Sequence, residues 1–303
     1  MTPQTPPVPP PSVPPPPVLT PPVLKVRSRR PRVRWTADLL IGTVLTGSVV
    51  MLVLLAGLIF PAGTDVMDLS ARLQPPHFTA PHPLGTDPIG RDVLSRVVYG
   101  GRISLTVGLV SVALSAVIGT LLGLIAGFFR GPVGAVIMRL ADVQLAFPFI
   151  LLAITVIAII GPGLWKLIAV MVVSQWAQYA RIMRGQVLAL REREYVQAAQ
   201  ALGANNARMM FRHIIPNAVG PLVVLATLNV ANNILLESGL TFLGLGVDPQ
   251  IPSWGGMLAD GRTYLQTAWW VSVFPGVAIT LTVLGFNLLG DWLRDTLDPT
   301  GRS

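Results

Sequence analysis

The residues of this chain whose types could support catalytic or metal chemistry are few. Three histidines, His77, His82 and His213, share no helical spacing with one another or with acids, so a histidine metal site is not expected. The chain has no cysteine, which excludes disulfides, thiolate metal sites and cysteine nucleophiles. No glycine-rich segment continues into the lysine and serine or threonine of a phosphate-binding loop. We therefore expect no catalytic residue, no metal site and no hydrolysis of ATP by this chain.

Polar side chains inside otherwise apolar segments are the next candidates. In a membrane such groups face the interior of a helix bundle or a water-filled path. Amides there also join helices by hydrogen bonds. Lining of a translocation path and interhelical bonding therefore both stay open for Asn229, Asn232, Asn233 and Glu237 in segment 214–240 and for Asn287 in segment 269–293. Asp142 follows Arg139 by three residues, and this spacing favours an ion pair within one helix.

The polar segment 190–213 has the pattern of two short helices. Its first helix, from Glu194, would carry one apolar face formed by Tyr195, Ala198, Ala199 and Leu202. Gly203 would end that helix as a left-handed cap. Asn205 or Asn206 would begin the second helix, which contains Arg208, and Pro216 is tolerated where the next apolar segment starts. The apolar face either docks a partner or packs on the chain's own helices.

Composition shows which elements must position these residues. Hydrophobic residues make up 52% of the 303 residues, charged residues only 12%, and the mean hydropathy is +0.63. A soluble chain of this size carries about twice that share of charge. We therefore expect an all-α membrane protein with six transmembrane helices. The six apolar segments are 37–60, 103–129, 133–160, 164–188, 214–240 and 269–293.

Small residues and prolines mark special positions within these segments. A stripe of glycine and serine in segment 103–129 predicts close approach of another helix. Prolines inside three segments predict kinks. The stripe consists of Gly108, Ser111, Ser115, Gly119 and Gly123, and the prolines are Pro148, Pro221 and Pro275.

Charge predicts the orientation. If both termini are cytoplasmic, sixteen of the 22 basic residues lie on the inner side, as the positive-inside rule requires. Trp35 and the pair Trp269 and Trp270 would then lie in the two interfacial aromatic belts. The chain would consist of an N-terminal tail (1–34), a first transmembrane helix (35–60), an outer loop (61–102), a five-helix core (103–293) and a cytoplasmic tail (294–303).

Two extramembrane segments complete the prediction. Thirteen of the 28 prolines lie between Pro3 and Pro31, so the tail should be extended and disordered, unless a partner that reads polyproline binds it. A basic cluster follows the tail and should lie at the lipid surface. In the outer loop, Asp87 and Pro88 should start a short surface helix that Gly100 and Gly101 end.

Two motifs together resemble a known family. Ala198, Ala199, Gly203 and Pro216 match the EAA motif of importer-type ABC permeases, although Gln197 stands where that motif has glutamate, and His213 and Ile215 replace its isoleucine and leucine. The segments Leu84-Gly-Thr-Asp-x-x-Gly-Arg-Asp92 and Gly101-Arg-x-Ser-Leu105 are similar to the C-type permeases of the dipeptide, oligopeptide and nickel branch, and to its dipeptide permeases most of all. The resemblance covers about residues 35–299.

The resemblance implies a type I ABC importer permease fold in the cytoplasmic membrane of a prokaryote. It implies a homologous B-type permease subunit, two cytoplasmic ATPase subunits and an extracytoplasmic solute-binding protein as partners, with lipid around the helices and no nucleic acid. The chain would bind no cofactor, because ATP and magnesium would belong to the ATPases. Segment 194–212 would be the helix that couples to an ATPase. Glu237 would meet a peptide's ammonium group, cap an outer gate or contact Arg102.

Several alternatives stay open or are disfavoured. Within the same family the solute could be a nickel chelate, glutathione or a longer oligopeptide. An ion-coupled secondary transporter would need intramembrane acids on broken helices and inverted repeats, of which only Asp142 is a candidate. An intramembrane enzyme would need a constellation of acid, serine or histidine at membrane depth, and no histidine lies within a segment. Five further apolar segments argue against a polyproline scaffold on a single anchor.

Overall fold

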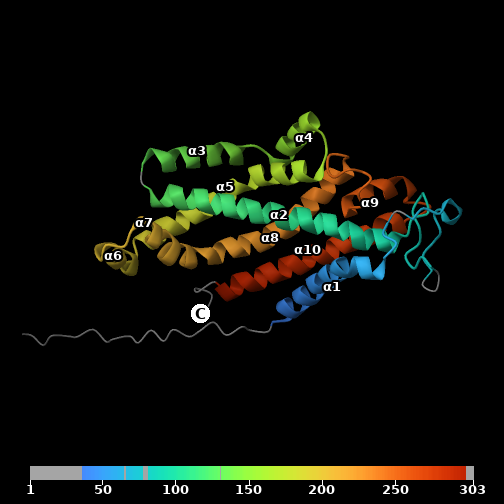
Figure 1. Cartoon of the computed structure of the whole chain (residues 1–303), viewed down its shortest axis with the longest axis horizontal. Coiled ribbons are helices and arrows are strands. Elements are labelled where there is room, and N and C mark those ends of the chain that lie inside the picture. Colours follow the sequence, from blue (N-terminus) through green and yellow to red (C-terminus); the bar gives the residue numbers. More distant parts are fainter. Residues whose placement is uncertain (1–35, 65, 78–80, 130, 298–303) are drawn as a thin grey trace, which may run out of the picture. The chain divides into compact units, whose positions relative to one another are not determined.

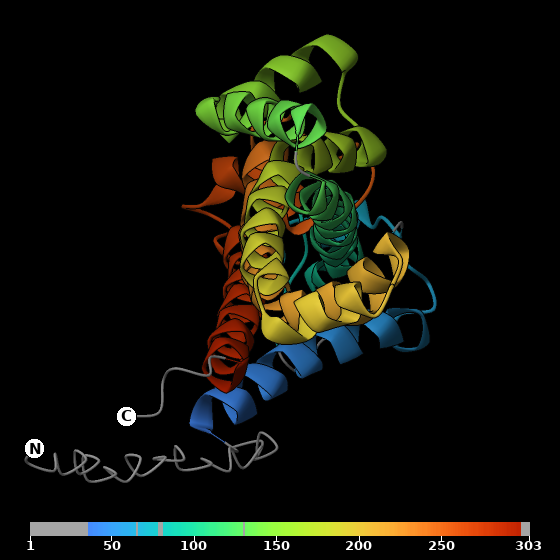
Figure 2. The ribbon, with the colours of Figure 1, turned by 90° about the vertical axis from the view of Figure 1, so that its left-hand side faces the viewer.

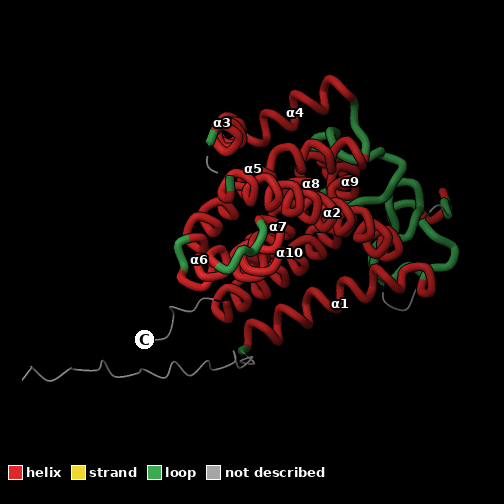
Figure 3. The backbone as a smooth tube through the Cα atoms, turned by 60° about the vertical axis from the view of Figure 1, so that its left-hand side comes forward, coloured by secondary structure: helices red, strands yellow, loops and turns green. Residues whose placement is uncertain are grey.

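The structure, a computed structural model, describes residues 36–64, 66–77, 81–129 and 131–297. The proline-rich tail, its basic cluster, Trp35 and Arg130 lie outside the described residues. Figure 3 draws the described chain as helices joined by loops, with no strand. The longer helices are α1 (Ala37–Ile59), α2 (Val93–Phe128), α3 (Pro132–Ala146), α4 (Phe149–Ile160), α5 (Leu164–Arg191), α8 (Ile215–Phe242) and α10 (Trp270–Leu297). The short ones are α6 (Glu194–Ala201), α7 (Asn206–Arg208), α9 (Trp254–Gly261), 3₁₀ turns at Leu69–Ala71 and Arg262–Tyr264, and a π-helical turn at Met209–Ile214.

The prediction of an all-helical membrane protein is confirmed. Among the described residues, α1, α2, α8 and α10 are long and apolar enough to cross a membrane, and the bent pair α3 and α4 makes a fifth span if the two are counted together. Helix α5 has 28 residues, about 42 Å at 1.5 Å per residue, but a more polar composition. Six crossings are therefore compatible with the structure.

The long helices run in alternate directions between two ends, which we call the α6 end and the α9 end (Figure 1). Helix α2 packs against both α5 and α8, while α1 packs on α10 and α3 packs on α5. Seen from the α6 end, α3 and α4 lie on one side of the central helices and α1 lies on the other (Figure 2). The helices α2, α5 and α8 therefore form the centre of the bundle.

The small-residue stripe of α2 sits where the sequence predicts a close helix contact. All five residues of the stripe are buried. A methyl group at Gly119 would overlap the carbonyl oxygen of Trp176, and one at Gly123 would overlap that of Ala180. Both of these partners lie on α5, so the glycines let the backbones of α2 and α5 approach each other closely.

The predicted surface helix before α2 is wrong. Asp92, not Asp87, caps the helix by accepting the amide N–H of Ser95 at 2.7 Å, and α2 then runs through Gly100 and Gly101 without a break. The two glycines lie inside the helix, where they allow α2 to pack closely against α9 and the residue before it. A methyl group on Gly101 would lie 2.9 Å from the ring of Trp254 on α9.

The third predicted segment is not one kinked helix. Helices α3 and α4 are bent by 89° at Phe147 and Pro148. Proline disfavours helical geometry in the residue before it and lacks an N–H, so α3 ends before Pro148 and α4 begins after it. In contrast, Pro221 and Pro275 lie inside α8 and α10, which continue past them.

Helix α7, the π-helical turn and α8 form one continuous helical run of 37 residues, Asn206–Phe242. Its first residues lie beside α6, and its last residues reach the α9 end (Figure 1). The last helix, α10, extends to Leu297, beyond the end predicted for the sixth segment.

Candidate functional site

Helix α6 has two unlike faces. Val196 is buried and packs with Met209, Ile214 and residues of α2 and α5. On the other side, Leu202 is 89% exposed, more than any other large apolar side chain in the described chain. Tyr195, Ala198, Gly203 and Arg208 are also exposed, and Ala199 is half-buried. One face of α6 therefore packs on the bundle and the other is open, and docking of a partner on the open face stays a prediction.

The turn between α6 and α7 follows the predicted geometry. Gly203 has a φ of +82°, which confirms the left-handed cap, and its N–H donates to the carbonyl oxygen of Gln200 at 2.9 Å. Asn205 begins the second helix by accepting the N–H of Arg208 at 2.8 Å. The π-helical turn that follows was not predicted. Pro216 lies in the first turn of α8, directly after the π-helical turn.

A groove of about 760 Å³ opens beside the start of α6. It lies where the end of α5, the start of α6 and the start of α8 meet. Its walls combine acidic, basic and aromatic groups with an amide: Leu190, Glu192, Arg193, Glu194, Tyr195 and Asn217. A protein surface with complementary charge could insert here next to the exposed face of α6.

Asn233 is the centre of a buried amide network between three helices. Its Nδ2 donates to the Ser111 hydroxyl on α2 at 2.7 Å and to Gln175 Oε1 on α5 at 3.2 Å. Gln175 Nε2 donates back to Asn233 Oδ1 at 2.5 Å. Asn233 therefore joins α2, α5 and α8 by hydrogen bonds.

Glu237 is fully buried and bound by hydroxyl groups. Ser104 on α2 donates to its carboxylate at 2.8 Å, Thr241 at 2.9 Å and Ser238 at 3.3 Å. The predicted contact between Glu237 and Arg102 is not formed, because the Nε of Arg102 instead donates to the carbonyl oxygen of Val53 at 3.1 Å. Glu237 ties α2 to α8 near the α9 end.

Asn229 and Asn232 line a cavity of about 350 Å³, whereas Asn233, Glu237 and Asn287 do not. The Nδ2 of Asn229 donates to the Tyr179 hydroxyl at 3.0 Å. The cavity lies beside the break between α3 and α4. Its full lining is Pro148, Phe149, Ile150, Ser174, Gln175, Gln178, Asn229, Asn232 and Leu236.

The predicted ion pair within segment 133–160 is also wrong. Asp142 accepts a hydrogen bond from Arg181 on α5 at 2.6 Å, and both side chains are more than half exposed. This ion pair joins α3 to α5, and the partner of Asp142 is Arg181 instead of Arg139. An exposed pair of this kind contributes little to stability.

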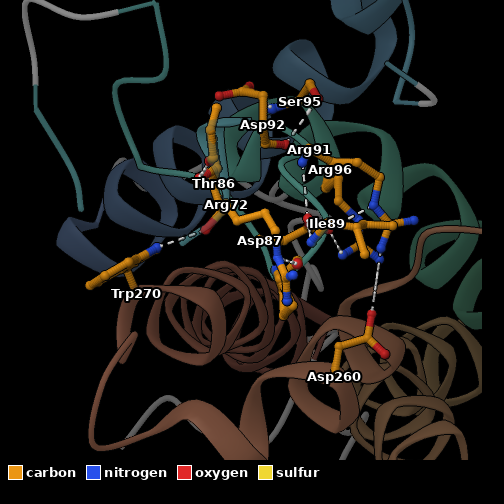
Figure 4. Close-up of polar contacts among 12 residues, drawn as sticks. Arg72, Thr86, Asp87, Ile89, Arg91, Asp92, Ser95, Arg96, Asp260 and Trp270 are labelled. Atoms are coloured by element: carbon orange, nitrogen blue, oxygen red, sulfur yellow. Dashed lines mark hydrogen bonds and ion pairs between the residues drawn. The ribbon is translucent and has the colours of Figure 1, made fainter. Parts of the chain in front are cut away.

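A buried ion cluster lies at the α9 end (Figure 4). One oxygen of Asp87 accepts the N–H groups of Ile89 and Arg91, each at 2.9 Å. The other binds Arg91 Nε at 2.6 Å and Arg96 Nη1 at 2.8 Å. Arg96 also reaches Asp260 on α9 at 3.1 Å. Asp87 therefore holds the loop before α2 against α9.

The predicted place of Trp270 in an interfacial aromatic belt is wrong. Trp269 is exposed, but Trp270 is buried, and its Nε1 donates to the carbonyl oxygen of Thr86 at 3.0 Å. Trp270 therefore fixes the loop before α2 onto α10 (Figure 4).

Sequence reasoning missed several polar groups. Gln175 and Gln178 lie three residues apart on α5, on the face that meets the asparagines of α8, and that spacing was available in the sequence. Ser104 and the ion centre at Asp87 depend on contacts between segments far apart in the chain. Among the described residues, no group of three or more acids or histidines could hold a metal ion.

Comparisons with known proteins agree with this architecture. The family described as "Binding-protein-dependent transport system inner membrane component" matches residues 119–302. The dipeptide transport system permease protein DppC of Alkalihalophilus pseudofirmus is 42% identical over 87% of this chain and 86% of its own. The di/tripeptide transport system permease protein DppC of Pseudomonas aeruginosa is 48% identical over 71% of each chain.

Two further similarities concern the solute and the fold. The glutathione transport system permease protein GsiD of Pectobacterium atrosepticum is 45% identical over 73% of this chain and 74% of its own. A crystal structure of an amino acid ABC transporter with histidines has the same fold, with a TM-score of 0.52 and 14% identity. The matched region covers 65% of the present chain and 92% of the transporter chain.

Proposed function

The chain belongs to the family of binding-protein-dependent transport system inner membrane components, and on that premise we propose that it moves short peptides, dipeptides above all, into a prokaryotic cell. Members of this family are permease subunits of ABC importers. The chain is therefore a multi-pass membrane protein and a transport subunit, not an enzyme, and it works with ATPases and a solute-binding protein.

We propose that the pore forms between this chain and a homologous B-type permease subunit in the cytoplasmic membrane. Two cytoplasmic ATPase subunits would hold all the ATP and magnesium, an extracytoplasmic binding protein would deliver the peptide, and lipid would surround the helices. Both termini would be cytoplasmic, as the excess of basic residues on that side favours. The α6 end would then face the ATPases and the α9 end the binding protein.

The exposed face of α6 supports the proposed coupling most directly. Leu202, at the end of α6, is 89% exposed, Tyr195 and Ala198 on the same helix are exposed too, and the charged groove of Glu192, Arg193 and Glu194 opens at the helix's start. Val196, on the opposite face, anchors α6 to the bundle. Movement of an ATPase against α6 would therefore pass to α5 and α8 as a push on packed side chains.

Transport would follow from two conformations with different ATPase contacts. Nucleotide can shift a conformational equilibrium only when its contacts differ between the two states. Approach of the ATPases would favour one position of α6, and the long helices would follow it from an inward-open to an outward-open arrangement. The chain itself would supply no reacting group.

The test is uptake by the complete importer in proteoliposomes, with both permeases, the ATPases and the binding protein. A labelled dipeptide should enter in an ATP-dependent manner, in competition with unlabelled dipeptides. Uptake of a nickel chelate or of a long oligopeptide, with none of dipeptides, would contradict the peptide assignment.

Coupling is tested on the same preparation with a pair of matched leucines. Leu202→Asp places a charge on the exposed face of α6 and should abolish recruitment of the ATPase and uptake. Leu243→Asp is the control, since Leu243 is 60% exposed at the opposite end of α8. Normal recruitment of the ATPase and normal uptake in the Leu202→Asp variant would show that α6 does not dock the ATPase.

Glutathione is the second candidate solute. The 45% identity to a glutathione permease supports it, and glutathione is itself a tripeptide. Competition between labelled dipeptide and unlabelled glutathione separates the two candidates, because the preferred solute should displace the other at lower concentration.

A further inference from the structure

The cavity beside the broken span combines a helix break with an uncharged polar wall. Irregular backbone at membrane depth is tolerated where it is buried in protein or lines a cavity. Here Pro148, at the 89° break between α3 and α4, lines the cavity together with side chains of α5 and α8. Broken helices of this kind mark solute sites in other transporters. The cavity beside Pro148 has a volume of about 350 Å³, which lies at the lower end of the range for small-molecule sites, roughly 300–1,000 Å³.

Four amide side chains line the cavity, and they fall into two pairs. Gln175 and Asn229 are buried and held in place, Gln175 by Asn233 and Asn229 by the Tyr179 hydroxyl. Gln178 and Asn232 are exposed, and neither has a hydrogen-bond partner among the described residues. The first pair fixes the wall, and the second is free to bind something else.

The chemistry of the free pair matches one class of ligand. A side-chain amide offers two donor hydrogens and one acceptor oxygen, and a peptide group offers one N–H donor and one C=O acceptor. The Oδ1 of Asn229 also receives no hydrogen bond from the described residues and can accept one more. The wall can therefore pair with the N–H and C=O groups of a peptide backbone.

The lining carries no formal charge. None of its nine residues is acidic or basic, and Glu237, one turn beyond Asn233, is bound by three hydroxyl groups instead. Neither the ammonium nor the carboxylate of a peptide would be held by an ion pair. The polar contacts of this wall with a peptide would therefore be hydrogen bonds alone.

We propose that this cavity is a transit site that binds the backbone of a passing peptide through Gln178 and Asn232, whatever the peptide's side chains. The inference rests on the proposed function and adds a location and a mode of recognition. Selectivity among side chains would then reside outside this cavity.

The test uses the complete reconstituted importer and the double variant Gln178→Leu with Asn232→Leu. Leucine keeps the walls neutral and of similar size but removes the hydrogen bonds, so dipeptide uptake should fall at least about tenfold at saturating binding protein. The loss should be the same for dialanine, alanyl-lysine and alanyl-glutamate. The conservative pair Gln178→Asn with Asn232→Gln should restore most of the uptake.

Controls separate this site from folding and from the proposed function. Gln144→Leu changes an amide on α3 that does not line the cavity, and uptake should be unaffected. The double leucine variant should still assemble with the ATPases and melt as the unaltered protein does. Normal uptake by that variant, or a loss that depends on side-chain charge, would overturn the transit site alone. No peptide uptake by the unaltered importer would instead overturn the proposed function.

Discussion

Asp87 and Arg96 form an ion pair of 2.8 Å that is almost fully removed from solvent, with 0% and 3% of their side-chain surfaces exposed. Asp87 lies in the loop before α2, and Arg96 lies in the first turn of α2. Because Arg96 also binds Asp260 on α9, this one guanidinium connects three segments of the α9 end.

Replacing Asp87 with asparagine should destabilise the protein strongly. The change leaves Arg91 and Arg96 without the carboxylate between them, and loss of one partner of a buried ion pair costs about 3–5 kcal/mol. Asp260→Asn is the control, because Asp260 is 45% exposed and its loss should cost about 1 kcal/mol or less. Thermal melting in detergent measures both, and equal melting temperatures would contradict the central position of Asp87.

Helix packing can be tested by adding one methyl group at two glycines. Gly123→Ala should destabilise by about 1–3 kcal/mol, because the new methyl overlaps the carbonyl oxygen of Ala180. Gly185→Ala, on α5, meets open space and should be neutral or stabilising, since alanine favours helix over glycine by up to about 1 kcal/mol. Melting of the two variants side by side gives the comparison.

Coupling of α6 to the ATPase can be tested at two glycines that both have a positive φ angle. Gly203 and Gly63 have φ values of +82° and +73°, and a side chain at either meets open space. Valine at either position therefore costs on the order of 1–2 kcal/mol locally. Of the two valine variants, only Gly203→Val should abolish binding-protein-stimulated ATP hydrolysis and uptake. Ala199→Asp on α6 should have the same effect as Gly203→Val. Parallel losses in Gly63→Val would mean that the defect is one of stability.

Orientation can be tested with single cysteines, because the chain has none of its own. Val66→Cys in the loop before α2 should react with a membrane-impermeant reagent in intact cells, and Gln197→Cys on α6 should react only after permeabilisation. Both positions are exposed, so labelling reports the side of the membrane. The opposite pattern would reverse the proposed topology.

The sequence predicted best those features that depend on a few neighbouring residues. The left-handed cap at Gly203, the start at Asn205 and the beginning of the first helix at Ala37 follow from local chemistry, and the structure has them. The small-residue stripe of α2 was also predictable, because three- and four-residue spacing defines one face of a helix.

Features that depend on distant partners were not predictable. Gly100 and Gly101 look like a helix end, yet α2 continues through them because α9 packs there. Asp142 has a plausible partner three residues away, but Arg181 on α5 binds it. Of the candidate path residues, Asn229 and Asn232 line the cavity and Asn233 does not, a difference set by which neighbour each amide meets.

The π-helical turn at Met209–Ile214 affects how far one end of the helical run Asn206–Phe242 is rotated about the helix axis relative to the other end. That run is about 55 Å long, with the exposed side of α7 near its start and Asn229 and Asn232 in its second half. Each helical residue turns the chain by about 100°, so the residue count fixes the azimuth of one end against the other. A wider turn absorbs an extra residue without breaking the helix. Met209–Ile214 is therefore the place in this run where a single residue can be gained or lost without rotating its ends, whereas an insertion elsewhere would rotate the α6 end by about 100° against the residues that line the cavity.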